Sequence, residues 1–104
     1  MPGARARLPE RSVLVLTSLA GGDKHGYALI KDIEAFSGIK LGPGTLYGAL
    51  ARLERDGLAE AQPAVNRRLP YKITAEGRTR LQAHLSEAAR IAEFGLDRIA
   101  MGGA

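Results

Sequence analysis

The most apolar segment of the chain lies near its start, between residues 11 and 20. Its apolar side chains are too closely spaced to share one stripe of a helix with a period of about 3.6 residues. They are Val13, Leu14, Val15, Leu16 and Leu19. This pattern predicts a first helix that is buried on more than one side. We expect one side to face the chain's own core and the other, with Leu14 and Leu16, to face a second subunit.

A second helix is predicted from about residue 26 to residue 37, after a break rich in glycine at residues 21–23. Its apolar positions recur four and seven residues apart, as in an ordinary amphipathic helix. The core face holds Leu29, Ile33 and Phe36. The opposite arc holds Tyr27, Lys31 and Glu34.

A third helix is predicted to begin at Pro43, because the missing N–H of proline suits the first turn of a helix. It ends at Gly57, since glycine is favoured just after a helix. Its core face is lined by Leu46, Leu50 and Leu53. The outward arc has almost no bulk in its first half and consists of Gly44, Thr45, Gly48, Ala51, Arg52 and Arg55.

Two short strands are predicted next, at about residues 58–62 and 69–73. The second strand is indicated by apolar side chains at alternate positions. Pro70 lacks the N–H that a strand donates to its neighbour, so we expect an edge strand or a bend there.

The last predicted helix begins after Thr74, a favourable N-cap residue, and reaches about Met101. Its apolar positions alternate three and four residues apart, close to heptad spacing. Such a helix spans roughly 40 Å at about 1.5 Å per residue, which is longer than a core of this size can cover. We therefore expect a partner helix along Leu81, Leu85, Ala88, Ala92, Phe94, Leu96 and Ile99.

The order helix, helix, helix, hairpin, long helix indicates a mainly α fold with a small β-hairpin. It is the order of a winged helix-turn-helix, here followed by a long C-terminal dimerisation helix. We divide the chain into a flexible basic arm at residues 1–10, a winged helix-turn-helix domain at residues 11–74, and a dimerisation helix and tail at residues 75–104. A chain of 104 residues leaves no room for a reader domain plus a separate effector domain.

Charge favours an anionic partner, since fifteen Lys and Arg against eleven Asp and Glu give a net charge of +4. The chain has no cysteine, and its two histidines, His25 and His84, lack metal-ligand spacing. No serine lies in the glycine pattern of a nucleophile elbow. The sequence therefore predicts no enzyme, no metal site and no cofactor.

The arginines before residues 12–20 imitate a short secretion signal. We reject that interpretation, because cleavage would remove the most apolar segment and nothing downstream could replace it. The same segment is far shorter than the roughly 20 apolar residues that span a bilayer. We expect no membrane partner and a cytoplasmic location of the bacterial or archaeal type.

Three features fit binding to double-stranded DNA. The third helix begins with Gly44 and Thr45, small residues at a terminus whose free N–H groups attract phosphate. The hairpin carries arginines that could track phosphates or enter a minor groove. The second helix presents Tyr27 and Lys31 one turn apart on its polar face. The candidate DNA-binding residues are Tyr27, Lys31, Gly44, Thr45, Tyr47, Gly48, Arg52, Asn66, Arg67 and Arg68.

Some of these residues have simpler explanations that stay open. Tyr27 and Tyr47 could pack at the rim of the core, and Arg52 and Arg55 could pair with acidic neighbours or with solvent. A winged helix used only for protein contacts is the rival function, but it would favour an acidic or apolar face on the third helix.

The chain also resembles the PadR family of winged-helix regulators, and the resemblance covers roughly residues 11–100. Its most specific part is the Pro-Gly-Thr-Leu-Tyr run that begins the third helix. The segments that carry the resemblance are His25-Gly26-Tyr27, Gly42-Pro43-Gly44-Thr45-Leu46-Tyr47, Asp56-Gly57-Leu58 and residues 67–78.

The resemblance implies a homodimeric repressor on a pseudo-palindromic operator, with the third helix in the major groove and the wing on the flanking backbone or minor groove. It implies DNA contacts from Thr45 and Tyr47, a phosphate contact from Tyr27 and a structural role for His25. Gly42 departs from the capping serine that is common in the family. The family also implies a small hydrophobic effector at the dimer interface, but the chain has no Trp to stack on it, and Phe94 suits interface packing.

Overall fold

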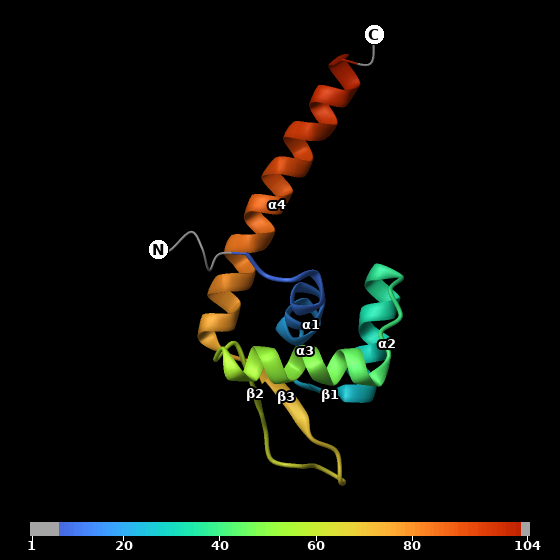
Figure 1. Cartoon of the computed structure of the whole chain (residues 1–104), viewed down its shortest axis with the longest axis vertical. Helices are drawn as coiled ribbons and strands as arrows, with labels where there is room; N and C mark the ends of the chain where they lie inside the picture. Colours follow the sequence, from blue (N-terminus) through green and yellow to red (C-terminus); the bar gives the residue numbers. More distant parts are fainter. Residues whose placement is uncertain (1–6, 103–104) are drawn as a thin grey trace.

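The computed structural model describes residues 7–102, which form four helices and a three-stranded sheet (Figure 1). Residues 1–6 of the expected basic arm and residues 103–104 of the tail lie outside the described residues. The elements in chain order are α1 (Glu10–Ala20), β1 (Lys24–His25), α2 (Gly26–Ser37), α3 (Pro43–Arg55), β2 (Ala59–Ala61), β3 (Pro70–Ile73) and α4 (Ala75–Gly102).

The helix ends follow local chemistry. His25 caps α2, because its Nδ1 accepts a hydrogen bond from the Ala28 N–H at 3.4 Å. Gly38 ends the same helix in the left-handed conformation, with φ of 77°. Thr74 caps α4 as predicted: its Oγ1 accepts from the Gly77 N–H at 3.0 Å and donates to the Gly57 carbonyl at 2.7 Å.

The sheet differs from the predicted hairpin, because a third strand joins it. β3 is the central strand, with β1 antiparallel on one side and β2 antiparallel on the other. The expectation that Pro70 marks an edge strand is therefore wrong. Pro70 lies opposite His25 at the first position of β3, where a missing N–H is tolerated.

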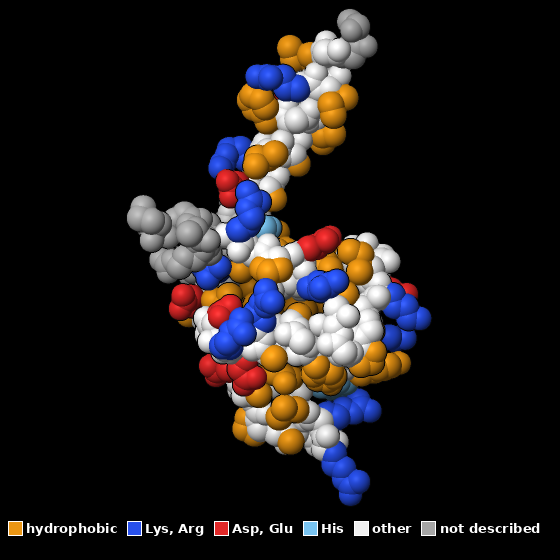
Figure 2. Space-filling view, in the orientation of Figure 1, with side chains coloured by type: hydrophobic (Ala, Val, Ile, Leu, Met, Phe, Trp, Pro, Cys, Tyr) orange, Lys and Arg blue, Asp and Glu red, His pale blue; other side chains and the backbone are white. Residues whose placement is uncertain are grey.

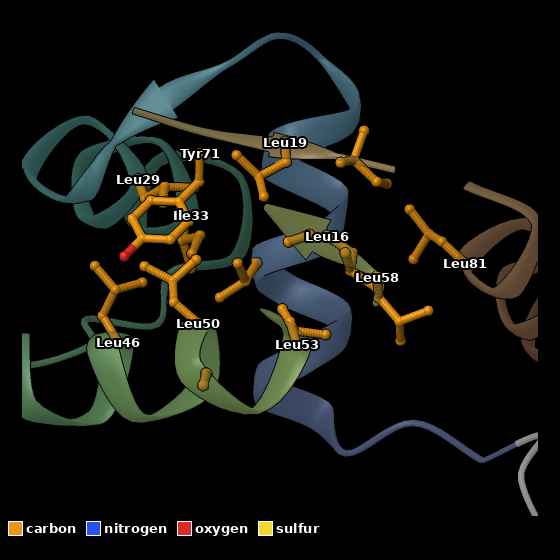
Figure 3. Close-up of a cluster of buried hydrophobic side chains, with 14 of the residues drawn as sticks. Leu16, Leu19, Leu29, Ile33, Leu46, Leu50, Leu53, Leu58, Tyr71 and Leu81 are labelled. Atoms are coloured by element: carbon orange, nitrogen blue, oxygen red, sulfur yellow. The ribbon is translucent and has the colours of Figure 1, made fainter. Parts of the chain in front are cut away.

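The hydrophobic core surrounds α1 and takes its other side chains from α2, α3, the sheet and the first turns of α4 (Figure 3). Leu16 and Leu19 are fully buried in its middle. Leu16, expected at a dimer interface, thus belongs to the protomer's own core, and Leu81 packs against the same core. Phe36, expected inside, is half exposed because it lies close to the end of α2.

One polar cluster ties α1 to α2. The Ser18 hydroxyl is buried and donates to the Asp32 carboxylate at 2.6 Å. Lys24 lies 3.9 Å from the same carboxylate and donates to the Gly22 carbonyl at 3.2 Å and to the Ser18 carbonyl at 2.5 Å. The buried hydroxyl is thus satisfied, which keeps its desolvation from destabilising the fold.

Helix α4 leaves the core after its first turns and extends far beyond it (Figure 1). Within this helix only Gly77 and Leu81 are buried. Gly77 is required at its position, because a Cβ there would overlap the Leu58 carbonyl. The rest of α4 carries exposed apolar side chains, which are seen as separate orange groups along the projecting helix in Figure 2.

The central place of α1 can be tested with Leu16→Ala. We expect a loss of about 2–5 kcal/mol in the free energy of unfolding, because the side chain is fully buried and a cavity remains. Urea unfolding at fixed protein concentration measures it. The control is Leu69→Ala, at an exposed position in the wing, the hairpin of β2 and β3 at residues 59–73. It should change stability far less, and equal losses in the two variants would contradict this packing.

Candidate nucleic-acid interface

The outward face of α3 separates into two flanks with different neighbours. Thr45 and Arg52, seven residues apart, lie on the flank that faces the start of α1, where they line a groove with Ser12. Tyr47 and Glu54, also seven residues apart, lie on the flank that faces α2 and the sheet. The sequence predicted one continuous outward face for this helix. The two flanks could not be told apart, because helical spacing alone does not say which element lies beside each of them.

Tyr47 is held against the first residue of α2. A Cβ on Gly26 would overlap the Tyr47 hydroxyl, so only glycine allows the ring to lie there. The ring is still half exposed, and one side of it remains available to a ligand. The contact joins two segments that are distant in sequence, and sequence reasoning missed the role of Gly26.

Tyr71 lies beneath the same flank of α3, from the central strand. Burial raises the pKa of its phenol, and the neighbouring Glu54 and Tyr47 raise it further. A tyrosine hydroxyl is uncharged at neutral pH in any case, and this shift moves its ionisation further away from neutral pH. Tyr71 supports the flank that carries Tyr47 without adding a charge to it.

Tyr27 and Lys31 lie together on the exposed face of α2, as their spacing predicted. The Lys31 Nζ is 5.7 Å from the centre of the Tyr27 ring, within the range of a cation–π interaction. Tyr27 is 63% exposed, so it is no part of the core. The pair offers a phenol hydroxyl and an ammonium group next to Gly26.

The wing ends in a two-residue turn between Val65 and Arg68, whose backbones exchange hydrogen bonds of 2.8 and 2.9 Å. Both central residues are left-handed: φ is 52° at Asn66 and 66° at Arg67. This is the type I′ pattern, in which asparagine is favoured first and glycine second. Arginine at the second position costs roughly 1–2 kcal/mol of backbone strain.

Arg68 turns back towards α2. One guanidinium nitrogen lies 3.2 Å from Nε2 of His25, whose Nδ1 caps the helix. A neutral imidazole has one acceptor nitrogen, and both Arg68 and the Ala28 N–H are donors, so the ring accepts from one of them at a time. When the His25 ring accepts from the Ala28 N–H and so caps α2, the Arg68 guanidinium is available to another acceptor.

The start of α2 thus brings together three parts of the chain that are distant in sequence: Tyr47 from α3, Arg68 from the wing, and the Tyr27–Lys31 pair. Figure 1 shows the wing and the start of α2 at the end of the molecule opposite the free end of α4. All the candidate residues are exposed, but Thr45 and Arg52 lie across α3 from this cluster.

Other kinds of site lack support in the described part of the chain. Within residues 7–102, no three side chains of His, Cys, Asp or Glu gather closely enough to hold a metal ion. None of the helices in that range is long and apolar enough to cross a membrane.

Comparison with known proteins shows the family to which the chain belongs. The family described as "Transcriptional regulator PadR-like family" matches residues 15–83. An "Uncharacterized 37.1 kDa protein in transposon TN4556" from Streptomyces fradiae is 44% identical over 85 residues, which is 82% of this chain. The matched part of the chain spans 25% of the length of that curated relative.

Two solved structures share the whole fold. A transcriptional regulator from Clostridium thermocellum is 28% identical with a TM-score of 0.74, covering 84% of this chain and 87% of that one. A PadR family transcription regulator from Clostridium difficile is 25% identical with a TM-score of 0.78, covering 88% of this chain and 99% of that one. Because the family match spans more than half of the chain, this protein belongs to the PadR-like family of transcriptional regulators.

Proposed function

We propose that this protein is a homodimeric repressor that binds a pseudo-palindromic DNA operator. The observation that carries the proposal is the meeting of Tyr47, Arg68 and the Tyr27–Lys31 pair at the start of α2. It gives one end of the molecule aromatic hydroxyls, guanidinium groups and an ammonium group. A protein-contact module would not require this set of phosphate and base-edge donors.

On DNA, α3 would enter the major groove with Gly44 and Gly48 closest to the groove floor. A Cβ at either glycine would meet nothing within 4 Å, so the backbone can approach closely. Tyr47 would contact base edges or the sugar-phosphate backbone, and Tyr27 and Lys31 would contact phosphates. Asn66, Arg67 and Arg68 would reach the flanking backbone or minor groove from the wing.

The dimer would form along α4. Its exposed apolar side chains include Phe94 at 58%, Leu96 at 67% and Ile99 at 71% exposure, too large an apolar surface to leave in water. Leu85, Ala88 and Ala92 continue this surface towards the core, and Leu14 of α1 is partly buried against that core. A small hydrophobic effector could enter such an interface beside Phe94, whose ring is covered by the Arg98 guanidinium at 4.5 Å.

The proposal is tested by binding to DNA from the gene's own upstream region and to scrambled DNA over a salt series. We expect tight binding to one segment and a steep loss of affinity as salt rises, because phosphate contacts release counterions. Tyr47→Ala should weaken specific binding and leave the dimer intact. Equally weak binding to both DNAs would contradict the proposal and favour a protein-contact module.

The strained wing turn gives a second prediction. Arg67→Gly should raise the free energy of unfolding by about 1 kcal/mol, since glycine adopts the left-handed conformation without strain. The same change should weaken operator binding about tenfold through loss of the guanidinium.

Arg67→Ala is the matched control, because it removes the guanidinium and keeps the strain. It should weaken binding as much as Arg67→Gly without the gain in stability. Operator affinity that is unchanged in both variants would remove Arg67 from the interface.

The dimer is tested by placing charges on α4. Leu96→Glu combined with Ile99→Glu should give a sedimentation mass of one chain at micromolar concentration, because buried carboxylates would face each other across the interface. Val65→Glu, at a wing position that is 60% exposed, should keep the mass of two chains. A two-chain mass in the double variant would show that the subunits meet elsewhere.

A further inference from the structure

A groove of about 300 Å³ lies between the start of α1 and the flank of α3 that faces away from the wing. On the face of the molecule shown in Figure 2, several Lys and Arg side chains lie over the body of the fold, with acidic side chains beside some of them. The groove is lined by Pro9, Arg11, Ser12, Gly44, Thr45, Gly48, Ala49 and Arg52.

Two helices begin at this groove without a side-chain cap. The N-cap residues are Pro9 for α1 and Gly42 for α3, and neither makes a capping hydrogen bond through its side chain. The first N–H groups that donate to a carbonyl four residues earlier are those of Val13 in α1 and Leu46 in α3. The preceding N–H groups therefore lack helical acceptors, and those from groove-lining residues belong to Arg11, Ser12, Gly44 and Thr45.

Ser12 provides an independent sign of a ligand. Its side chain lines the groove and the residue is only 2% exposed. Among residues 7–102, no hydrogen-bond partner is found for its hydroxyl, in contrast to the equally buried Ser18. Because its oxygen is not enclosed, the hydroxyl can donate to a ligand that enters the groove.

The charges at the groove are positive and available. Arg11 and Arg52 are exposed, and neither guanidinium has an ion pair or hydrogen bond with another described residue. The groove continues past Arg52 into a second hollow that is also lined by Arg80 and by the acidic residues Asp56 and Glu76. Asp56 is already paired with Arg55 at 3.5 Å, which leaves this surface predominantly basic.

We propose that this groove binds a phosphate group. The groove is bordered by residues that carry free backbone N–H groups at two helix N-termini, by the hydroxyl residues Ser12 and Thr45 and by two arginines, and both helix dipoles favour an anion near those termini. These donors are more numerous than the hydrogen bonds that the two oxygens of a carboxylate can accept. A phosphate, with three or four oxygens, can accept more of them. The phosphate comes either from a DNA backbone that passes this flank of α3 or from a small phosphorylated molecule.

The test uses the full chain and pyrophosphate without DNA, so it does not depend on operator recognition. Amide resonances are followed during titration against sodium chloride of equal ionic strength. We expect saturable shifts centred on Arg11, Ser12, Gly44 and Thr45. Arg11→Gln and Arg52→Gln should each weaken binding about tenfold, and Arg78→Gln, an exposed position that does not line the groove, should not.

Ser12→Ala separates a ligand role from a structural one. Because the hydroxyl has no partner within the described fold, its removal should leave the melting temperature in phosphate-free buffer unchanged or higher, while pyrophosphate binds more weakly. A lower melting temperature together with unchanged pyrophosphate binding would make Ser12 a structural residue and overturn the proposal. Shifts that match the chloride control, or that persist equally in Arg11→Gln and Arg52→Gln, would overturn it as well.

A duplex from the gene's upstream region then distinguishes the two sources. If the groove holds a DNA phosphate, the duplex should displace pyrophosphate, and Arg11→Gln should lower the salt slope of DNA binding by about one. If the groove holds a small phosphorylated molecule, pyrophosphate should still bind to the protein–DNA complex, or its binding should change the affinity of the protein for DNA. Both results support a phosphate site and assign its occupant.

Discussion

The burial of α1 is the constraint on which the rest of the molecule depends. This helix contacts α2, α3, β3 and α4, and its Leu16 and Leu19 are fully enclosed. The Ser18–Asp32 hydrogen bond fixes its orientation against α2. Because α1 occupies the centre, α2 and α3 must pack around it, which places the first residue of α2 beneath Tyr47 and one flank of α3 beside the start of α1.

This arrangement gives α3 two chemically different flanks. The flank towards the sheet is aromatic and is supported by the uncharged phenol of Tyr71. The flank towards α1 is made of small residues, hydroxyls and arginines, and it faces uncapped helix termini. The proposed DNA contacts concentrate on the first flank and the wing, and the proposed phosphate site lies on the second. Gly44 and Gly48 belong to both proposals, since they line this groove and would lie closest to the floor of the DNA major groove.

Much of the fold could be predicted from the sequence, because α2, α3 and α4 each carry an apolar period and because end signals such as Pro43 and Thr74 mark where helices begin. The strand β1 could not be predicted, since two residues have no period and pair only because β3 is beside them. The burial of Leu16 was also missed, because an all-round apolar helix fits a subunit contact as well as a core. For the site, sequence identified the exposed residues, but the roles of Gly26 and Ser12 depend on contacts between elements and leave no local pattern.

The projecting α4 has a geometric consequence for the proposed dimer. If two reading ends are joined only through this rigid helix, the register of the helix pair sets the distance between them. A slip of one heptad moves one subunit about 10 Å along the other at about 1.5 Å per residue. That is about three base pairs at about 3.4 Å each. The helix that joins the subunits would thus also act as a ruler, matching the molecule to one spacing of half-sites.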